Sequence, residues 1–155
     1  MSQTNSLADA TVPATCGLRD FLVARVGRTH VAIPADRVEV VLEARDGNEP
    51  PCDEPWVGGW FVHRDRMFLA LRLDGRDAPR SDVAKRVVVR ESDHARFAID
   101  VDEVYGPAVL DDVMESPFPA AGWHAPKDWL RLGVAFDGRV ICRVDVDAVA
   151  ARLAG

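Results

Sequence analysis

The chain has 155 residues, of which 48% are hydrophobic and 28% charged, and its formal net charge is −6 at pH 7. A chain of this length is one ordinary domain, or two small sub-domains that share a core because neither could bury enough surface alone. The acidic balance argues against a nucleic-acid binder, which needs a basic face, and against attachment to anionic membrane surfaces.

The N-terminal segment, residues 1–18, is rich in Ser, Thr, Asn and Ala and has no hydrophobic period, which predicts a flexible tail. It has no basic n-region followed by an apolar run, and no stretch of the chain is long enough to span a bilayer. The three cysteines are odd in number and irregularly placed, which favours reduced thiols over a disulfide framework. We therefore expect a cytoplasmic protein.

Two β-hairpins are predicted, the first over residues 21–34 with Gly27 in its turn, and the second over residues 86–101 with a polar turn. Similar sequences begin in the second strand of each hairpin and continue past it, "VAIPADRVEVVL" and "FAIDVDEVYGPAVL". Their matching residues are 98 − 32 = 66 positions apart. A long spacing that occurs once indicates a duplicated sub-domain. Asp36 and Asp102 stand after these hairpins where an N-cap would, and are expected to hold a turn.

Each half continues with a tryptophan, a turn and a longer strand, starting from Trp56 and from Trp129. Alternation places apolar residues on one face of each long strand: Met67, Leu69, Leu71 and Leu73 in one, and Val140, Cys142, Val144 and Val146 in the other. Apolar residues at helical spacing from Val146 predict a short C-terminal helix. About ten short strands in two similar sets favour a mainly β fold of two small barrels side by side.

Sequence signals for catalysis are weak. The tripeptide "HRD" at residues 63–65 occurs in protein kinases, but no glycine-rich phosphate loop or "DFG" accompanies it and the chain is too short. The histidines and cysteines never fall into metal-ligand spacing. Cys142 lies in an apolar strand without a partner base, and Asp100, Asp102 and Glu103 alternate sides of a strand, which favours turn capping over paired acid/base work. We expect no enzyme activity, metal or cofactor.

Arg64 is the more promising candidate. It lies in a turn that joins two apolar strands, next to Trp60 and Phe61. An isolated turn arginine is usually a solvated charge, but arginine beside aromatic residues at a strand end is typical of protein-interface hot spots. The four tryptophans are expected to divide between core and contact surface.

The order of these motifs resembles the CheW-like coupling proteins of bacterial chemosensory arrays, over roughly residues 20–153. Asp36, Val38, Glu39 and Val40 match the family element "D-x-V-x-E-V"; Val101, Asp102, Glu103, Val104 and Gly106 match "V-D-E-V-x-G"; Gly133, Gly138, Arg139 and Asp145 match the last hairpin. The segment "GWFVHRDRMFLALRL" keeps Gly59, Arg64 and Leu73 of the family pattern "G-V-x-N-L-R-G-x-x-x-P-V-x-D-L". It departs from that pattern at Val62, His63, Asp65, Leu69 and Arg72.

The resemblance implies two five-stranded SH3-like barrels, intertwined in one domain over residues 19–155. It implies a non-enzymatic adaptor that joins the cytoplasmic tips of chemoreceptors to the regulatory domain of a histidine kinase at membrane-associated arrays. The partner-binding residues it indicates are Arg64, Glu39, Val40, Gly59, Trp60 and Val62. No nucleic acid and no membrane insertion are expected.

Two alternatives stay open. A barrel module of the same fold could have lost receptor coupling and recruit or localise another cytoplasmic protein, and the departures around Arg64 bear on this. A rarer alternative is a ligand-sensing barrel, which small metabolites would stabilise against heat.

Overall fold

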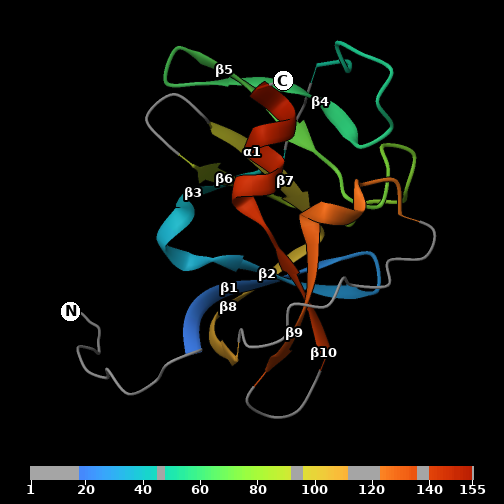
Figure 1. Ribbon diagram of the computed structural model, residues 1–155. Coiled ribbons are helices and arrows are strands. Elements are labelled where there is room, and N and C mark those ends of the chain that lie inside the picture. The colour runs from blue at the N-terminus through green and yellow to red at the C-terminus, as the bar shows by residue number, and fades with distance from the viewer. Residues whose placement is uncertain (1–17, 45–47, 92–95, 112–122, 136–139, 155) are drawn as a thin grey trace.

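Ten strands and one α-helix make up the described part of the chain, which in the computed structural model comprises residues 18–44, 48–91, 96–111, 123–135 and 140–154. Five strands form a closed barrel in the order β1-β2-β10-β9-β8: β1 (Leu18–Val26), β2 (Thr29–Pro34), β8 (Glu103–Asp111), β9 (Leu130–Ala135) and β10 (Val140–Val144). The other five form a second sheet in the order β3-β6-β7-β5-β4: β3 (Val38–Glu43), β4 (Val57–His63), β5 (Arg66–Leu71), β6 (Lys85–Arg90) and β7 (Arg96–Val101). Helix α1 (Val146–Ala154) ends the described chain (Figure 1).

The two sheets share one strand arrangement, which confirms the mainly β fold of two similar five-stranded units. The order β8-β1-β2-β10-β9 of the barrel repeats as β3-β6-β7-β5-β4 in the second sheet. The numbers of any two equivalent strands differ by five, as for β1 and β6. Each sheet therefore combines the first hairpin of one half with the last three strands of the other half. Parallel pairing at equivalent places, β2 with β10 and β5 with β7, joins the halves.

The sheets differ at one edge. Pairing of β8 with β9 closes the barrel. Within the described ranges, the equivalent strands β3 and β4 form no ladder with each other. Asn48, in the connection between them, makes an isolated antiparallel bridge to Trp60 on β4.

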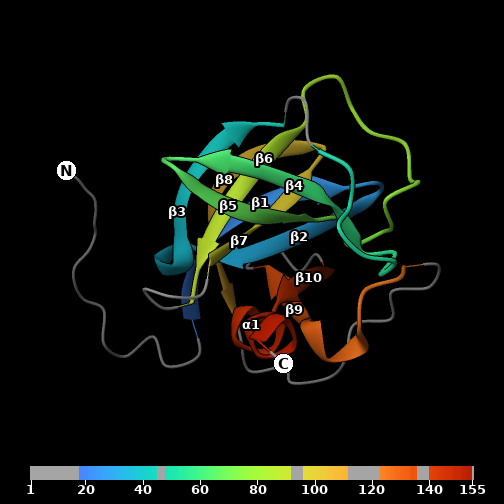
Figure 2. The same cartoon turned by 90° about the horizontal axis from the view of Figure 1, so that it is seen from above.

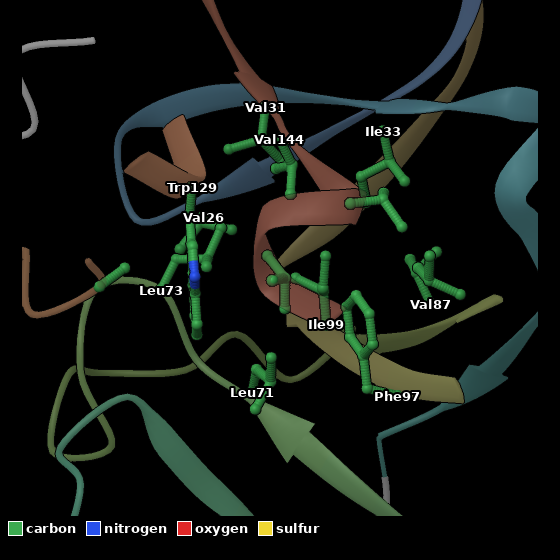
Figure 3. Close-up of a cluster of buried hydrophobic side chains, with 14 of the residues drawn as sticks. Val26, Val31, Ile33, Leu71, Leu73, Val87, Phe97, Ile99, Trp129 and Val144 are labelled. Atoms are coloured by element: carbon green, nitrogen blue, oxygen red, sulfur yellow. The ribbon is translucent and has the colours of Figure 1, made fainter. Parts of the chain in front are cut away.

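The largest hydrophobic core lies where the two sheets and α1 meet. Figure 3 shows its members converging from both units: Val26, Val31, Ile33 and Val144 from the barrel, Leu71, Val87, Phe97 and Ile99 from the second sheet, and Leu73 and Trp129 from connections. The rings of Trp56 and Trp129, equivalent in the duplication, meet edge to face with centroids 4.8 Å apart. Since burying one such side chain stabilises a fold by about 1.5–3 kcal/mol, this shared core holds the units together.

The predicted apolar faces of the two long strands are confirmed except at their first positions. Leu71, Leu73, Cys142 and Val144 are at most 1% exposed, whereas Met67 and Val140 are 63% and 61% exposed. The predicted helix is present as α1, which Figure 2 shows end-on beside β9 and β10. The side chain that caps α1 is Asp145, whose Oδ1 accepts a hydrogen bond from the Ala148 N–H at 3.1 Å.

The capping role predicted for Asp36 is wrong. Asp36 is exposed in a 3₁₀ turn, Ala35–Arg37, which has no side-chain cap. Asp102 is buried and does hold a turn, but a distant one, because its Oδ2 accepts a hydrogen bond from the Gly27 N–H at 2.7 Å. Residues 1–17 of the predicted tail, residues 92–95 of the predicted polar turn and positions 138 and 139 lie outside the described residues.

Candidate functional site

Arg64 and Asp65 form the tip of the β4–β5 hairpin. His63 and Arg66 are the last paired residues, so the turn between them has two residues. Both turn residues have positive φ, 52° for Arg64 and 64° for Asp65, as a type I′ hairpin turn requires. Asn and Gly usually occupy such positions, because a left-handed backbone costs other residues roughly 1–2 kcal/mol. The fold thus holds an exposed arginine at a strained tip, a kind of strain that tends to gather at functional sites.

Two exposed apolar side chains lie next to this tip. Val62 on β4 pairs with Met67 on β5, and they are 60% and 63% exposed. Met67 also lies at a groove of about 240 Å³ between the second sheet and α1. The other residues that line this groove are Leu69, Arg96, Phe97, Ala150, Leu153 and Ala154. An exposed apolar surface with an arginine at its end has the composition of a protein contact surface.

Trp60 and Gly59 lie on β4 further from the hairpin tip than Val62 does. Trp60 is half-buried, and its backbone N–H and C=O bond to the backbone of Asn48. Gly59 is buried beneath the same residue, because a Cβ at this position would lie 2.3 Å from the Asn48 carbonyl oxygen. A side chain at Gly59 is therefore sterically excluded, and the glycine shapes the edge of β4.

Glu39 and Val40 lie on β3, at the opposite edge of the second sheet from β4. Glu39 is the extra residue of a β-bulge, and its Oε1 accepts a hydrogen bond from Arg96 Nε at 2.9 Å. Because Arg96 also lines the groove beside α1, Glu39 is linked to that groove through an ion pair. Val40 is half-buried and packs on the cluster around Phe61.

The six predicted contact residues thus fall into three groups. Arg64, Val62 and Trp60 reach the surface along one hairpin, whereas Glu39 lies across the sheet, and Gly59 and Val40 are largely covered. Trp56 and Trp129 are core residues, 6% and 0% exposed, and Trp123 is half-buried and packs against the same core.

A buried charge network beside β5 was not predicted from the sequence. Arg72 is completely buried, and its guanidinium bonds two carboxylates, Asp74 at 2.5 Å and Asp102 at 2.9 Å. It also donates to the Pro79 carbonyl oxygen at 3.2 Å. Asp102 further accepts hydrogen bonds from the backbone N–H groups of Gly27 and Ser81. The only sequence signal for this network was that Arg72 stands where the family pattern has Asp.

Burial alone would raise the pKa of Asp102, but the hydrogen bonds from Arg72, Gly27 and Ser81 outweigh burial and lower it. Burial would lower the pKa of Arg72, but its hydrogen bonds and charge interactions with Asp102 and Asp74 outweigh burial and raise it. Both groups therefore stay charged, and the network serves the structure.

A second buried pair lies within the second sheet, between the paired residues Arg86 on β6 and Asp100 on β7. Arg86 Nε donates to Asp100 Oδ1 at 2.8 Å, and the Arg86 guanidinium lies 4.6 Å from the Phe61 ring centroid. Arg80 reaches the other oxygen of Asp100 at 3.3 Å. Since Asp100 and Asp102 each have their own arginine partner, the two carboxylates do not form an acid/base pair.

Other reactive groups are placed for structure. Burial raises the pKa of the Cys142 thiol to about 12, which keeps it protonated. In the ranges that the structure describes, no group of three or more His, Cys, Asp and Glu side chains could hold a metal ion. No helix in those ranges has the length and apolar character needed to span a membrane.

Comparison with known proteins gives a consistent picture. A family model described as the CheW-like domain matches residues 20–154. Among solved structures, the scaffolding protein TtCheW from Thermoanaerobacter tengcongensis is similar, with a TM-score of 0.65 and 14% identity over 82% of this chain and 88% of that chain. No curated protein matches significantly.

Proposed function

The chain belongs to the CheW-like domain family of non-enzymatic chemotaxis scaffolds, and we propose that it couples chemoreceptor tips to the regulatory domain of a histidine kinase. The observation that carries this proposal is the β4–β5 tip, where exposed Arg64 stands beside exposed Val62 and Met67. The site of action is the cytoplasmic side of a receptor array.

An adaptor needs separate contact surfaces and a fixed geometry between them. One surface is the hairpin tip with its apolar neighbours, and Glu39 at the far edge of the same sheet belongs to another. Continuous strand pairing from β3 through β6, β7 and β5 to β4 joins the two surfaces, and this fixes the distance between them.

The first experiment measures complex formation with the kinase regulatory domain and with a receptor fragment by size-exclusion chromatography and light scattering. We expect a stable complex with the kinase domain at micromolar concentrations. Arg64→Glu is expected to weaken receptor binding at least about fivefold, the effect of losing an interface anchor worth more than about 1 kcal/mol.

Arg66→Glu is the matched control. Arg66 is also exposed and lies two residues away on the same hairpin. Arg66→Glu changes the net charge of the hairpin by the same amount as Arg64→Glu. Equal weakening by both variants would mean a general electrostatic effect and would remove Arg64 from the contact site. Absence of any complex with the kinase domain would overturn the coupling function.

A second candidate is an interaction module that has lost receptor coupling. It is favoured by the tip itself, because His63 and Asp65 flank Arg64 where the family pattern has Leu and Gly. An unbiased pull-down that recovers a protein other than a receptor or kinase, and loses it with Arg64→Glu, would favour this candidate.

A further inference from the structure

Strand β3 forms one free edge of the second sheet. In the sheet order β3-β6-β7-β5-β4, β3 pairs only with β6, and Figure 2 shows it at the margin of the sheet. Among the described residues, no strand pairs with its other side. Such an edge presents backbone N–H and C=O groups to which another extended chain can bind.

The backbone groups of Val41 and Glu43 point away from β6. In an antiparallel pair, every second residue bonds the neighbouring strand, and the residues between them face outward. The Ala44 N–H donates to the Ala84 carbonyl oxygen at 3.2 Å, so Leu42, two residues earlier in the same register, also bonds β6. Val41 and Glu43 alternate with these residues, and their N–H and C=O groups therefore lie on the free edge.

The duplication provides a comparison, because β8 is the equivalent strand of the barrel. Val41 pairs with Val87 on β6, and its equivalent Pro107, since 107 − 66 = 41, pairs with Leu22 on β1. Proline has no N–H, so β8 offers no donor at this position, and a proline is one of the ways in which proteins protect edge strands. β3 has no such protection at Val41.

Charged side chains can also protect an edge, and β3 carries Glu39 and Glu43. Both are bound within the second sheet, Glu39 to Arg96 at 2.9 Å and Glu43 to Lys85. Val41 between them is 39% exposed. The β-bulge at Glu39 lies at the start of the strand, so Val41 and Glu43 belong to its regular part.

Val40 and Leu42 give this edge an apolar inner side. Both are half-buried and pack on the cluster that contains Phe61 and Phe68. A side chain directly opposite on an added strand would lie about 5 Å away and would cover this apolar surface further. The edge therefore suits a chain with apolar residues opposite both Val41 and Leu42.

We propose that β3 binds an extended, proline-free segment of a partner protein as an added antiparallel strand. The N–H groups of Val41 and Glu43 donate to the segment, and their carbonyl oxygens accept from it. Backbone bonds supply the affinity, and the apolar residues opposite Val41 and Leu42 set the register. The pairing requires no receptor or kinase, so it is tested separately from the coupling function.

The test uses the peptide acetyl-Lys-Thr-Ile-Val-Thr-amide, in which Val is placed opposite Val41 and Ile opposite Leu42. It is titrated into the full chain and followed by ¹H–¹⁵N NMR. Saturable shifts are expected along β3. Amide hydrogen exchange is expected to slow at Val41 and Glu43 but not at Leu42, because the Leu42 N–H is already bonded to β6.

Two N-methylated peptides form a matched pair. A methyl group on the Val nitrogen removes a donor that faces β3, and is expected to weaken binding at least about tenfold. A methyl group on the Ile nitrogen adds the same bulk on the side that faces away from β3, and is expected to change binding less than about threefold.

Val41→Pro reproduces in β3 the residue that β8 has at the equivalent position, and is expected to abolish binding. The ladder with β6 does not use the Val41 N–H, so the variant is expected to fold. Val41→Thr is the control, because it keeps the N–H and is expected to bind within about threefold of the unchanged chain. If Val41→Pro does not fold, the methylated peptides decide the question by themselves.

Several outcomes would overturn the proposal. These are no saturable binding at millimolar peptide, equal weakening by the two methyl groups, or unchanged binding to folded Val41→Pro. A concentration-dependent dimer in light scattering, which Val41→Pro dissociates, would assign the edge to a second copy of this chain and would also overturn docking of a partner segment.

Discussion

The Arg72 guanidinium and the Asp102 carboxylate face each other across 2.9 Å, with side chains 0% and 3% exposed. Arg72 directly follows β5 of the second sheet, whereas Asp102 lies between β7 and β8, where the chain passes from the second sheet to the barrel. Asp102 also holds the N–H of Gly27 in the β1–β2 turn of the barrel. One ion pair therefore ties both sheets together.

Asp102→Ala is expected to lower the free energy of unfolding by about 1–3 kcal/mol, because buried Arg72 loses one of its two carboxylate partners and the N–H groups of Gly27 and Ser81 lose their acceptor. Urea unfolding followed by circular dichroism measures the change. Asp36→Ala is the control, because Asp36 is the equivalent residue of the first half and is exposed, and its effect should stay within about 0.5 kcal/mol. Equal effects of the two variants would contradict the role assigned to the buried pair.

Stability is expected to fall in acid through Asp102. Its pKa lies below the ordinary value of 3.8, so the folded state binds its proton less readily than the unfolded state. The resulting stabilisation is fully present above the unfolded pKa and is lost as the pH falls through the folded pKa. Urea midpoints measured between pH 6 and pH 3 should decline less steeply for Asp102→Asn than for the unchanged chain. Parallel declines would show that other carboxylates dominate.

Asp65→Gly is expected to stabilise the protein by up to about 1 kcal/mol, because glycine adopts the positive φ of this turn position without steric cost. Asp65→Ala keeps the strain and should bring no gain. Thermal unfolding of the two variants makes the comparison. A lower melting temperature for Asp65→Gly than for Asp65→Ala would mean that the Asp65 side chain, and not its backbone, determines the turn.

Gly59→Ala is expected to destabilise the fold by about 1–3 kcal/mol, because its Cβ would lie 2.3 Å from a backbone oxygen of Asn48. Gly58→Ala is a close control. There the Cβ would meet the end of the Arg80 side chain at 2.9 Å, and a flexible side chain can move aside. Urea unfolding of both variants should separate them by at least about 1 kcal/mol, and equal stabilities would argue that the Asn48 bridge readjusts.

The sequence by itself determined the elements of this fold and their duplication. Hairpins with a turn glycine, alternating apolar strands and a short C-terminal apolar period are local patterns, and local patterns report on nearby residues. The duplication predicted from the 66-residue repeat is confirmed by the equivalent strand order of the two sheets. Arg64 could be placed in an exposed turn for the same reason.

Only the tertiary structure decided which strands share a sheet, and therefore which side chains meet. Each half contributes strands to both sheets, so contacts such as Arg72 with Asp102 join residues 30 positions apart. No local pattern distinguishes a buried, paired arginine from a solvated one, because the difference lies in partners that arrive from other strands.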